Sequence, residues 1–186
     1  MRIITGTARG TKLTTLEGDN TRPTPERVKE AVFSMIQFDL EDANFLALFA
    51  GSGQMGLEAL SRGAAKAHMI DRSPEAAAII RQNAEKTRLS DRASIMTSDA
   101  AEYIRSSKGR CKFDFVFLDP PYGSGLLHDS LAMLSDGKLL NDGAWIFAED
   151  EKNDPFAGDD DLAAKYEIVK ECGYGRVHIT VLKLKG

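Results

Sequence analysis

From Asn44 onward, short apolar runs alternate with segments whose apolar side chains recur every three or four residues. Short apolar runs bounded by polar residues or glycine are typical of buried strands, and the longer spacing is typical of amphipathic helices. The predicted strands are 45–49, 67–70, 93–97, 113–118 and 144–148, and the predicted helices are 55–60, 74–88, 100–105 and 126–134. Strands separated by helices at this spacing predict an α/β fold with a parallel, doubly wound sheet.

The pattern changes after the last of these strands. Residues 149–161 carry two acidic clusters around a stretch with proline and glycine, which indicates an acidic, solvated loop. Two β-prone runs, 166–169 and 177–182, then flank Gly173-Tyr174-Gly175 and predict a terminal hairpin. An antiparallel pair at the edge of a mostly parallel sheet is a common arrangement.

The N-terminal segment is basic. Arg2, Arg9 and Lys12 precede the first acidic side chain, and Gly6 and Gly10 separate two short β-prone pieces, so a small basic hairpin is expected. A helix is expected next, because Thr24 followed by Pro25 has the pattern of an N-cap with proline at the first helical position. One apolar face of that helix is formed by Val28, Val32, Met35 and Ile36.

Composition narrows the class of protein. The chain has 186 residues, of which 42% are hydrophobic and 28% charged, as in a single soluble domain with a sizeable core. No apolar run is long enough to span a bilayer, and the N-terminus lacks the apolar core of a signal peptide. Cys111 and Cys172 do not have the spacing of a metal site or disulfide framework, so a cytoplasmic protein is expected. A net charge of -4 disfavours indiscriminate nucleic-acid coating but leaves room for one basic face.

The first candidate site is the glycine-rich loop Phe49–Gly56, FAGSGQMG, between the first predicted strand and a helix. Gly51 and Gly53 allow a sharp turn close to a ligand, and Gly56 allows tight packing of helix on strand. Asp71 ends the next strand, where a carboxylate typically accepts hydrogen bonds from ribose hydroxyls. This pattern predicts a nucleotide-like pocket that suits NAD and S-adenosylmethionine equally well.

Asp99 and Ala100 follow the third predicted strand. The carboxylate can accept a hydrogen bond from an adenine amino group while the next backbone N–H meets a ring nitrogen. Asp99 is also a good N-cap for the helix that follows, and the sequence leaves both interpretations open.

The third candidate site is Asp119-Pro120-Pro121-Tyr122, directly after the apolar run 113–118. Two prolines restrict the backbone and remove two N–H donors, so the Pro120 carbonyl can face a substrate. That carbonyl and the Asp119 carboxylate can hold both hydrogens of a planar amine and favour a pyramidal, nucleophilic nitrogen. The carboxylate stabilises the charge that develops on the nitrogen, and Tyr122 can stack on the base. The motif predicts methylation of an exocyclic amine.

Several stretches together resemble the bacterial small-subunit rRNA guanine-N2 methyltransferases, the RsmD-like group. The resemblance lies in Asn20–Thr24, Arg27–Phe33, Phe49–Ala64 (FAGSGQMGLEALSRGA) and Asp119–Tyr122, in the same order along nearly the whole chain. It implies a Rossmann-like, class I methyltransferase fold with a seven-stranded, mostly parallel sheet, an antiparallel C-terminal hairpin and a small N-terminal hairpin/helix extension. One domain is expected, with an RNA-recognition extension at 1–38 and a catalytic core at 39–186.

The resemblance also implies the ligands and their contacts. S-adenosylmethionine is the expected methyl donor, 16S rRNA in the small subunit or its assembly intermediate the expected partner, and a monomer the default state. The expected catalytic residues are Asp119, Pro120, Pro121 and Tyr122. Donor-binding residues are expected to be Phe49, Ala50, Gly51, Ser52, Gly53, Met55, Gly56, Asp71, Arg72, Asp99, Ala100 and Asp119. RNA-binding residues are expected to be Arg2, Arg9, Lys12, Arg22, Thr24 and Arg27, although a few basic side chains at a helix start are also typical of a solvated surface.

One position departs from the family pattern. The first strand of the family usually reads Leu-Asp-Leu-Phe, whereas this chain has Leu46-Ala47-Leu48-Phe49. The missing carboxylate normally supports the donor loop, so a non-catalytic RNA-binding homologue with weakened donor binding stays open. The sequence is also compatible with methylation of adenine N6 or of a protein amide, and with a dinucleotide-dependent oxidoreductase.

Overall fold

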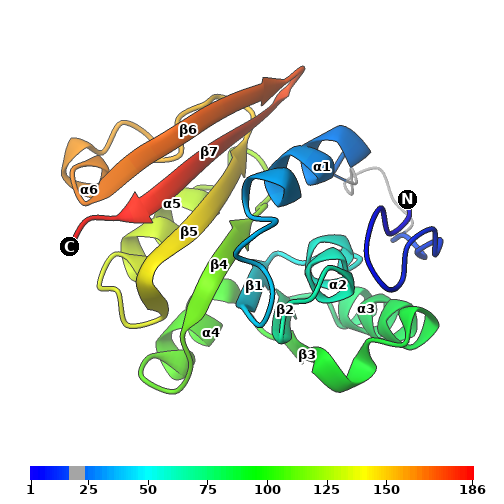
Figure 1. Cartoon of the computed structure of the whole chain (residues 1–186). Helices are drawn as coiled ribbons and strands as arrows, with labels where there is room; N and C mark the ends of the chain where they lie inside the picture. Colours follow the sequence, from blue (N-terminus) through cyan, green and yellow to red (C-terminus); the bar gives the residue numbers. More distant parts are fainter. Residues whose placement is uncertain (17–23) are drawn as a thin grey trace. The chain divides into compact units, whose positions relative to one another are not determined.

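The computed structural model describes residues 1–16 and 24–186. Its seven strands form one mixed sheet in the order β3-β2-β1-β4-β5-β7-β6 (Figure 1). The chain divides into two compact units, Met1–Ser98 and Asp99–Gly186. The mixed seven-stranded sheet with an antiparallel C-terminal pair confirms the predicted fold class. The proposed division into an extension and a core at residue 38 stays a prediction.

The first unit holds three parallel strands with their helices. Its elements are α1 (Glu26–Met35), β1 (Asn44–Leu48), α2 (Gln54–Ser61), β2 (Lys66–Asp71), α3 (Pro74–Thr87), the 3-10 turn η1 (Ser90–Arg92) and β3 (Ala93–Thr97). β1 pairs in parallel with β2, with Ala47 opposite Met69, and β2 pairs in parallel with β3. α2 packs on β1 and β2, and α3 packs on β2 and β3.

Local signals set the ends of α3. The Ser73 hydroxyl accepts a hydrogen bond from Ala76 N, Pro74 occupies the first turn, and Arg88 ends the helix in the left-handed conformation. Its buried face includes Ala76, Ala77, Ile80, Asn83 and Ala84. An N-cap side chain and an early proline are favoured at a helix start, so this helix was readable from the sequence almost to the residue.

The N-terminal segment pairs with itself in the antiparallel sense, as expected, but the helix after it lacks the expected cap. Its only strand-like pairing within residues 1–16 is a single antiparallel bridge between Arg2 and Lys12. The expectation that Thr24 caps α1 was wrong: the helix begins at Glu26, Pro25 occupies the N-cap position, and no described side chain caps the helix. Thr24 is instead buried. The predicted Arg22 lies outside the described residues.

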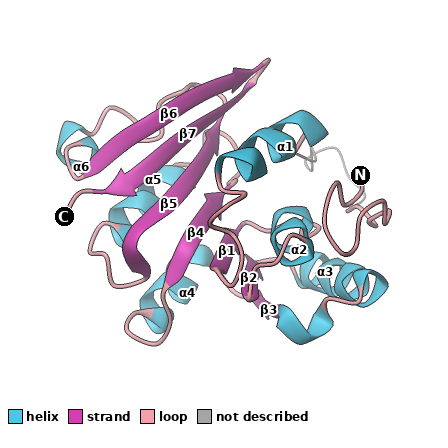
Figure 2. Cartoon of the chain, viewed as in Figure 1, coloured by secondary structure: helices cyan, strands magenta, loops and turns pink. Residues whose placement is uncertain are grey.

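The second unit combines one parallel strand pair with a long antiparallel ribbon (Figure 2). Its elements are α4 (Ala100–Ser107), β4 (Phe113–Leu118), α5 (Leu126–Leu134), β5 (Leu140–Asp150), α6 (Asp160–Ala163), β6 (Tyr166–Tyr174) and β7 (Val177–Leu184). β4 pairs in parallel with β5, whereas β5–β7 and β7–β6 are antiparallel. The β6–β7 pair confirms the predicted terminal hairpin.

The predicted solvated loop 149–161 was wrong at both ends. β5 continues to Asp150, and Glu149 is a buried strand residue with 3% exposure. Asp159 caps α6 by accepting a hydrogen bond from Leu162 N. Acidity alone suggested solvent at Glu149, but β7 pairs with Glu149 and Asp150, so the strand continues two residues past the apolar run. No helix among the described residues is long and apolar enough to cross a membrane.

Candidate functional site

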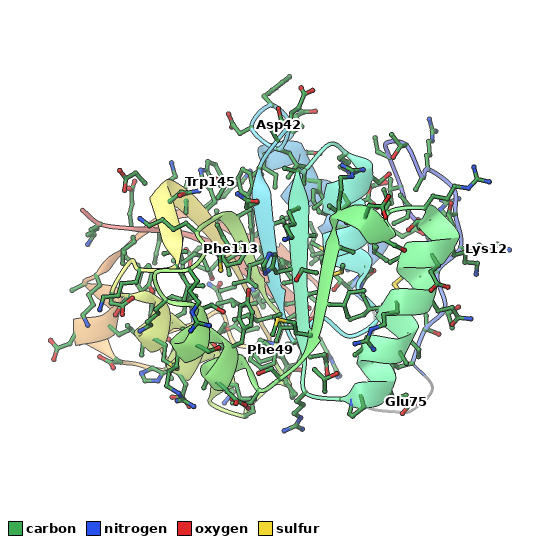
Figure 3. All side chains as sticks on the ribbon, turned by 90° about the horizontal axis from the view of Figure 1, so that it is seen from below. Lys12, Asp42, Phe49, Glu75, Phe113 and Trp145 are labelled. Carbon is green, nitrogen blue, oxygen red and sulfur yellow. The ribbon has the colours of Figure 1, made fainter. Side chains whose placement is uncertain are left out.

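In the first unit, the glycine-rich loop makes a strained turn from β1 into α2. Phe49, Gly51 and Gly53 have positive φ angles of 59°, 57° and 79°. A non-glycine residue in this region costs of the order of 1–3 kcal/mol, and it persists only where the surrounding structure holds it. Figure 3 places Phe49 at the end of β1, beyond the last paired strand residue. The loop is therefore a fixed turn with a defined shape.

The three glycines of the loop are explained by different local contacts. A Cβ atom at Gly53 would lie 2.8 Å from Ile80 Cγ2, and one at Gly56 would lie 2.5 Å from Met69 Cγ. These two glycines are required by packing of α2 against α3 and β2. A Cβ atom at Gly51 would meet nothing within 4 Å, so its surroundings leave room for a ligand.

The loop is tied to the end of β2 through its backbone. Ala50 N donates to the Ile70 carbonyl at 3.0 Å, and Gly51 N donates to Asp71 Oδ2 at 2.9 Å. The other carboxylate oxygen, Asp71 Oδ1, accepts from Ser73 N at 2.9 Å. Each carboxylate oxygen has a second lone pair, so Asp71 can support the loop and still accept from ribose hydroxyls. Arg72 is exposed beside it.

Asn83 on α3 joins the same loop to the N-terminal segment. Its side chain is fully buried, and its Nδ2 donates to the Ser52 and Thr14 carbonyls at 2.9 Å each. Its Oδ1 accepts from Thr14 N at 2.8 Å. The Ser52 hydroxyl also contacts Met1 Sδ at 3.6 Å. The glycine-rich loop thus shares one buried amide with the segment predicted to bind RNA, a link that sequence reasoning missed.

A second buried cluster holds the N-terminal segment to α2. Glu58 accepts hydrogen bonds from Ile4 N at 2.8 Å and Thr5 N at 3.0 Å, and it pairs with Lys29 Nζ at 3.3 Å and Arg62 Nε at 2.8 Å. The Glu58 and Lys29 side chains are completely buried. Burial lowers the pKa of Lys29, and the neighbouring Glu58 opposes that shift. Every charge in this cluster has an opposite charge beside it.

The basic residues predicted to bind RNA differ in their surroundings. Arg9 and Lys12 are exposed, and Figure 3 shows Lys12 on the N-terminal segment beside α3. Arg2 pairs with Glu26 at 3.2 Å, and Arg27 is exposed on α1. Contacts of these residues with RNA stay predictions.

In the second unit, Asp99 is the N-cap of α4. It accepts hydrogen bonds from Ala101 N at 2.9 Å and Glu102 N at 3.4 Å. The capping role is therefore confirmed. The exposed Asp99 and buried Ala100 lie at the end of a strand-to-helix connection, and their contact with an adenine stays a prediction.

Asp119–Tyr122 directly follows β4, as predicted. Asp119 is half-buried, Pro120 is buried, and Tyr122 is 42% exposed. The Pro121 carbonyl accepts from Ser124 Oγ at 2.6 Å and from Ser124 N at 3.3 Å, which closes a turn after the motif. The motif therefore combines a half-buried carboxylate with a solvent-exposed aromatic ring.

The principal surprise of this site is Glu149. The Tyr122 hydroxyl donates to Glu149 Oε1 at 3.1 Å. Leu118 pairs with Ala148 in the parallel β4–β5 register, so Asp119 and Glu149 are the next residues along neighbouring strands. Sequence reasoning missed Glu149 because it was assigned to a loop. One signal in the sequence could have found it: Asp119 and Glu149 each come directly after the apolar run of a predicted strand.

The two carboxyl groups affect each other. Burial raises the pKa of Asp119 well above its usual range, and the Glu149 charge raises it further. Burial also raises the pKa of Glu149 from 4.5 to about 7; the Tyr122 hydrogen bond opposes this and Asp150 adds to it. Like charges in a shared, poorly solvated place resist simultaneous ionisation, and perturbed groups of this kind mark candidate functional sites.

The strand order, with its antiparallel C-terminal pair, is that of the Rossmann-like methyltransferase fold. Residues 1–183 match the family model described as Conserved hypothetical protein 95, and the chain belongs to that family. This confirms the resemblance to the RsmD-like group.

Known relatives agree with this assignment. The chain is 38% identical over 151 residues to Ribosomal RNA small subunit methyltransferase D of Escherichia coli strain K12, covering 81% of this chain and 75% of that protein. It is 33% identical over 156 residues to the protein of the same name from Haemophilus influenzae, covering 83% and 81%. The solved structure of yhhF from Escherichia coli superposes with a TM-score of 0.86 at 31% identity, covering 100% of this chain and 98% of that one.

Proposed function

We propose that this chain is an S-adenosylmethionine-dependent rRNA methyltransferase that methylates the N2 amine of a guanine in 16S rRNA. The observation that carries the proposal is the Asp119–Tyr122 motif, with a half-buried carboxylate beside an exposed aromatic ring. The names of the relatives support small-subunit rRNA as the substrate. The guanine and the atom N2 are the finer part of the proposal, together with action in the cytoplasm on the small subunit or its assembly intermediate.

The first unit is proposed to hold the methyl donor. The open space at Gly51 admits a ligand close to the backbone, and the Asp71 carboxylate keeps lone pairs for ribose hydroxyls. S-adenosylmethionine supplies an electrophilic methyl group when bound.

At Ala47, where the family pattern has aspartate, another residue supports the loop. Ala47 is buried in β1 with 2% exposure, and the Gly51 backbone is held by Asp71 from the neighbouring strand. The loop therefore has a carboxylate support even though Ala47 cannot provide one. This favours a catalytic protein over an RNA-binding homologue that has lost donor binding.

The second unit is proposed to hold the acceptor base. Tyr122 stacks on the base, an interaction worth about 1–3 kcal/mol. The Asp119 carboxylate and the Pro120 carbonyl accept from the two N2 hydrogens, which aims the nitrogen lone pair at the methyl group. Most of the rate then comes from positioning and from stabilising the positive charge on nitrogen. The S–CH3 bond breaks as the N–CH3 bond forms, which leaves a neutral thioether, and the nitrogen then gives its extra proton to the Asp119 carboxylate.

The direct test is methyl transfer from labelled S-adenosylmethionine to small-subunit particles that lack the modification. We expect labelled 16S rRNA with the native chain and none with Asp119→Ala. Calorimetric titration with S-adenosylmethionine, with Ala47→Asp beside the native chain, separates donor binding from transfer. Absence of donor binding by the native chain, restored by Ala47→Asp, would overturn the catalytic proposal in favour of the non-catalytic homologue.

A further inference from the structure

Glu149 has an unusual hydrogen-bonding state for a buried carboxylate. Its side chain lies in the second unit at 3% exposure, and its Oε1 accepts from the Tyr122 hydroxyl. Its Oε2 is buried and has no hydrogen-bond partner among the described residues. Buried polar groups are almost always paired, so an unpaired carboxylate oxygen calls for a physical reason.

No cation among the described residues is paired with Glu149. The groups that shift its pKa are the Tyr122 hydroxyl and Asp150, and its own charge raises the pKa of Asp119. A structural carboxylate would be expected to have a cation or several backbone N–H donors, as Glu58 has. Glu149 is therefore poorly explained as a stabilising residue.

Its place in the sheet puts Glu149 beside the proposed base-binding motif. The parallel register pairs Leu118 with Ala148, so the residues that follow them, Asp119 and Glu149, leave neighbouring strands at the same level. The Tyr122 hydroxyl donates a hydrogen bond to Glu149. Glu149 therefore contacts Tyr122 and also lies next to Asp119, the carboxylate of the same motif.

We propose that Glu149 is a specificity-determining residue, whose Oε1 fixes Tyr122 and whose Oε2 accepts the ring N1–H of the target guanine. This inference rests on the proposed function and extends it to the choice of base. It assigns the recognition of guanine to a residue outside the Asp119–Tyr122 motif.

The chemistry of the base edges explains the choice. Beside its N2 amine, guanine presents a second donor, the N1–H. Beside its N6 amine, adenine presents an acceptor, the lone pair of N1. In their ionised forms, two adjacent carboxylates offer acceptors only, so they match the paired donors of guanine and repel the lone pair of adenine. The unpaired Oε2 of Glu149 thus gains a partner with guanine and none with adenine.

The test uses a base that keeps the amine and loses the neighbouring donor. 2-Aminopurine has the same N2 amine as guanine, but its N1 is an acceptor. The target position is first mapped with the native chain and then filled with guanine or 2-aminopurine in 16S rRNA reconstituted into small-subunit particles. At pH 8, above the pKa of about 7 that burial gives Glu149, the native chain is expected to prefer guanine on the order of 10- to 100-fold in kcat/KM.

Glu149→Gln isolates the residue, because an amide can accept from N1–H or donate to a bare N1. We expect the guanine preference to fall below about tenfold with this variant, through a loss on guanine and a gain on 2-aminopurine. 2-Aminopurine also lacks the O6 of guanine. The loss of contacts at O6 affects the native chain and Glu149→Gln equally, so it cancels when their preferences are compared. Tyr122→Phe is the control: it should lower both rates and leave the native preference.

Three results would overturn the inference. One is an unchanged preference in a folded Glu149→Gln variant that binds S-adenosylmethionine normally. Another is a native chain that methylates both bases equally, a result that needs no variant to fold. The third is N6-methyladenosine as the native product, which would overturn the guanine proposal as well. The first two results would leave guanine methylation itself intact, so the two failures can be told apart.

Discussion

Two buried glutamates, one in each unit, have opposite surroundings. Glu58 in α2 accepts from two backbone N–H groups and pairs with Lys29 and Arg62. Glu149 in β5 has one neutral donor, Tyr122, and an oxygen without a partner among the described residues. Both side chains are almost inaccessible to solvent. Burial of a carboxylate therefore does not separate structure from function, but the identity of its partners does.

The comparison also explains why the two residues respond differently to substitution. Removing Glu58 leaves the buried cation of Lys29 uncompensated, which is expensive. Removing the charge of Glu149 relieves an unfavourable burial, so the fold should tolerate the change while the chemistry suffers. Activity and stability are thus expected to move in opposite directions at Glu149.

The largest expected effect is on stability at Glu58. Glu58→Ala should lower the free energy of unfolding by about 3–5 kcal/mol, because Lys29 and two backbone N–H groups lose their acceptor. Denaturant unfolding monitored by circular dichroism measures the change. Glu85→Ala, on the exposed side of α3, is the matched control and should shift stability by less than about 0.5 kcal/mol. A Glu58→Ala protein as stable as the control would remove the distinction between the two glutamates.

The next effect is on chemistry at Asp119. Asp119→Ala should reduce methyl transfer by at least about 10²- to 10³-fold, since the developing charge on nitrogen loses its carboxylate. Calorimetry should find S-adenosylmethionine binding close to that of the native chain. Asp142→Ala, an exposed acidic residue in β5, serves as the control and should keep full activity. An active Asp119→Ala enzyme would contradict the mechanism.

A smaller effect is the pH dependence of stability that arises from Glu149. Its pKa is raised by burial from 4.5 to about 7 in the folded state, so the unfolded chain ionises first as pH rises. The free energy of unfolding should therefore fall between about pH 4.5 and pH 7, by roughly 1–3 kcal/mol from this group, and level off above.

Comparison with Glu149→Gln isolates that contribution. Thermal unfolding of the two proteins from pH 4.5 to 8 should show the variant gaining on the native chain as pH rises. Asp119, whose pKa is also raised, should leave a residual slope of the same sign in the variant. Parallel curves for the two proteins would mean that Glu149 does not carry the unfavourable charge.

The smallest effect is expected at Tyr122. Tyr122→Phe keeps the stacking ring and removes only the hydroxyl that bonds to Glu149. We expect a few-fold lower kcat/KM, in line with one hydrogen bond of about 1 kcal/mol, whereas Tyr122→Ala should lose considerably more. Steady-state kinetics on small-subunit particles measure both. Equal losses in the two variants would remove stacking from the account.

Much of the fold could be predicted because local signals and tertiary structure agree. The run 113–118 and the helix at 126–134 were predicted to the residue, and β3 likewise. The glycine loop and the Asp119–Tyr122 motif were readable because turns and proline pairs leave a strong mark in sequence. The capping role of Asp99 could also be predicted, because an aspartate directly before a helix is a typical N-cap.

The buried contacts that sequence reasoning missed join residues distant in sequence. Lys29 lies within an amphipathic helix, where a lysine is normally solvated, yet its side chain is buried and paired with Glu58. Glu149 belongs to an acidic triplet that indicates a loop, yet pairing with Ile179 of β7 extends the strand through it. Asn83 gives no signal in sequence, because its value depends on the Thr14 and Ser52 backbones that meet it. Such partners are set by packing, which local pattern does not report.

The measurement that tests the central claim most directly is nucleoside mass spectrometry of 16S rRNA. Unmodified small-subunit particles are incubated with S-adenosylmethionine and either the native chain or Asp119→Ala, and the rRNA is then digested. N2-methylguanosine formed by the native chain and absent with the variant is the predicted result. N6-methyladenosine, or no methylated nucleoside from a native chain that binds the donor, would contradict the account.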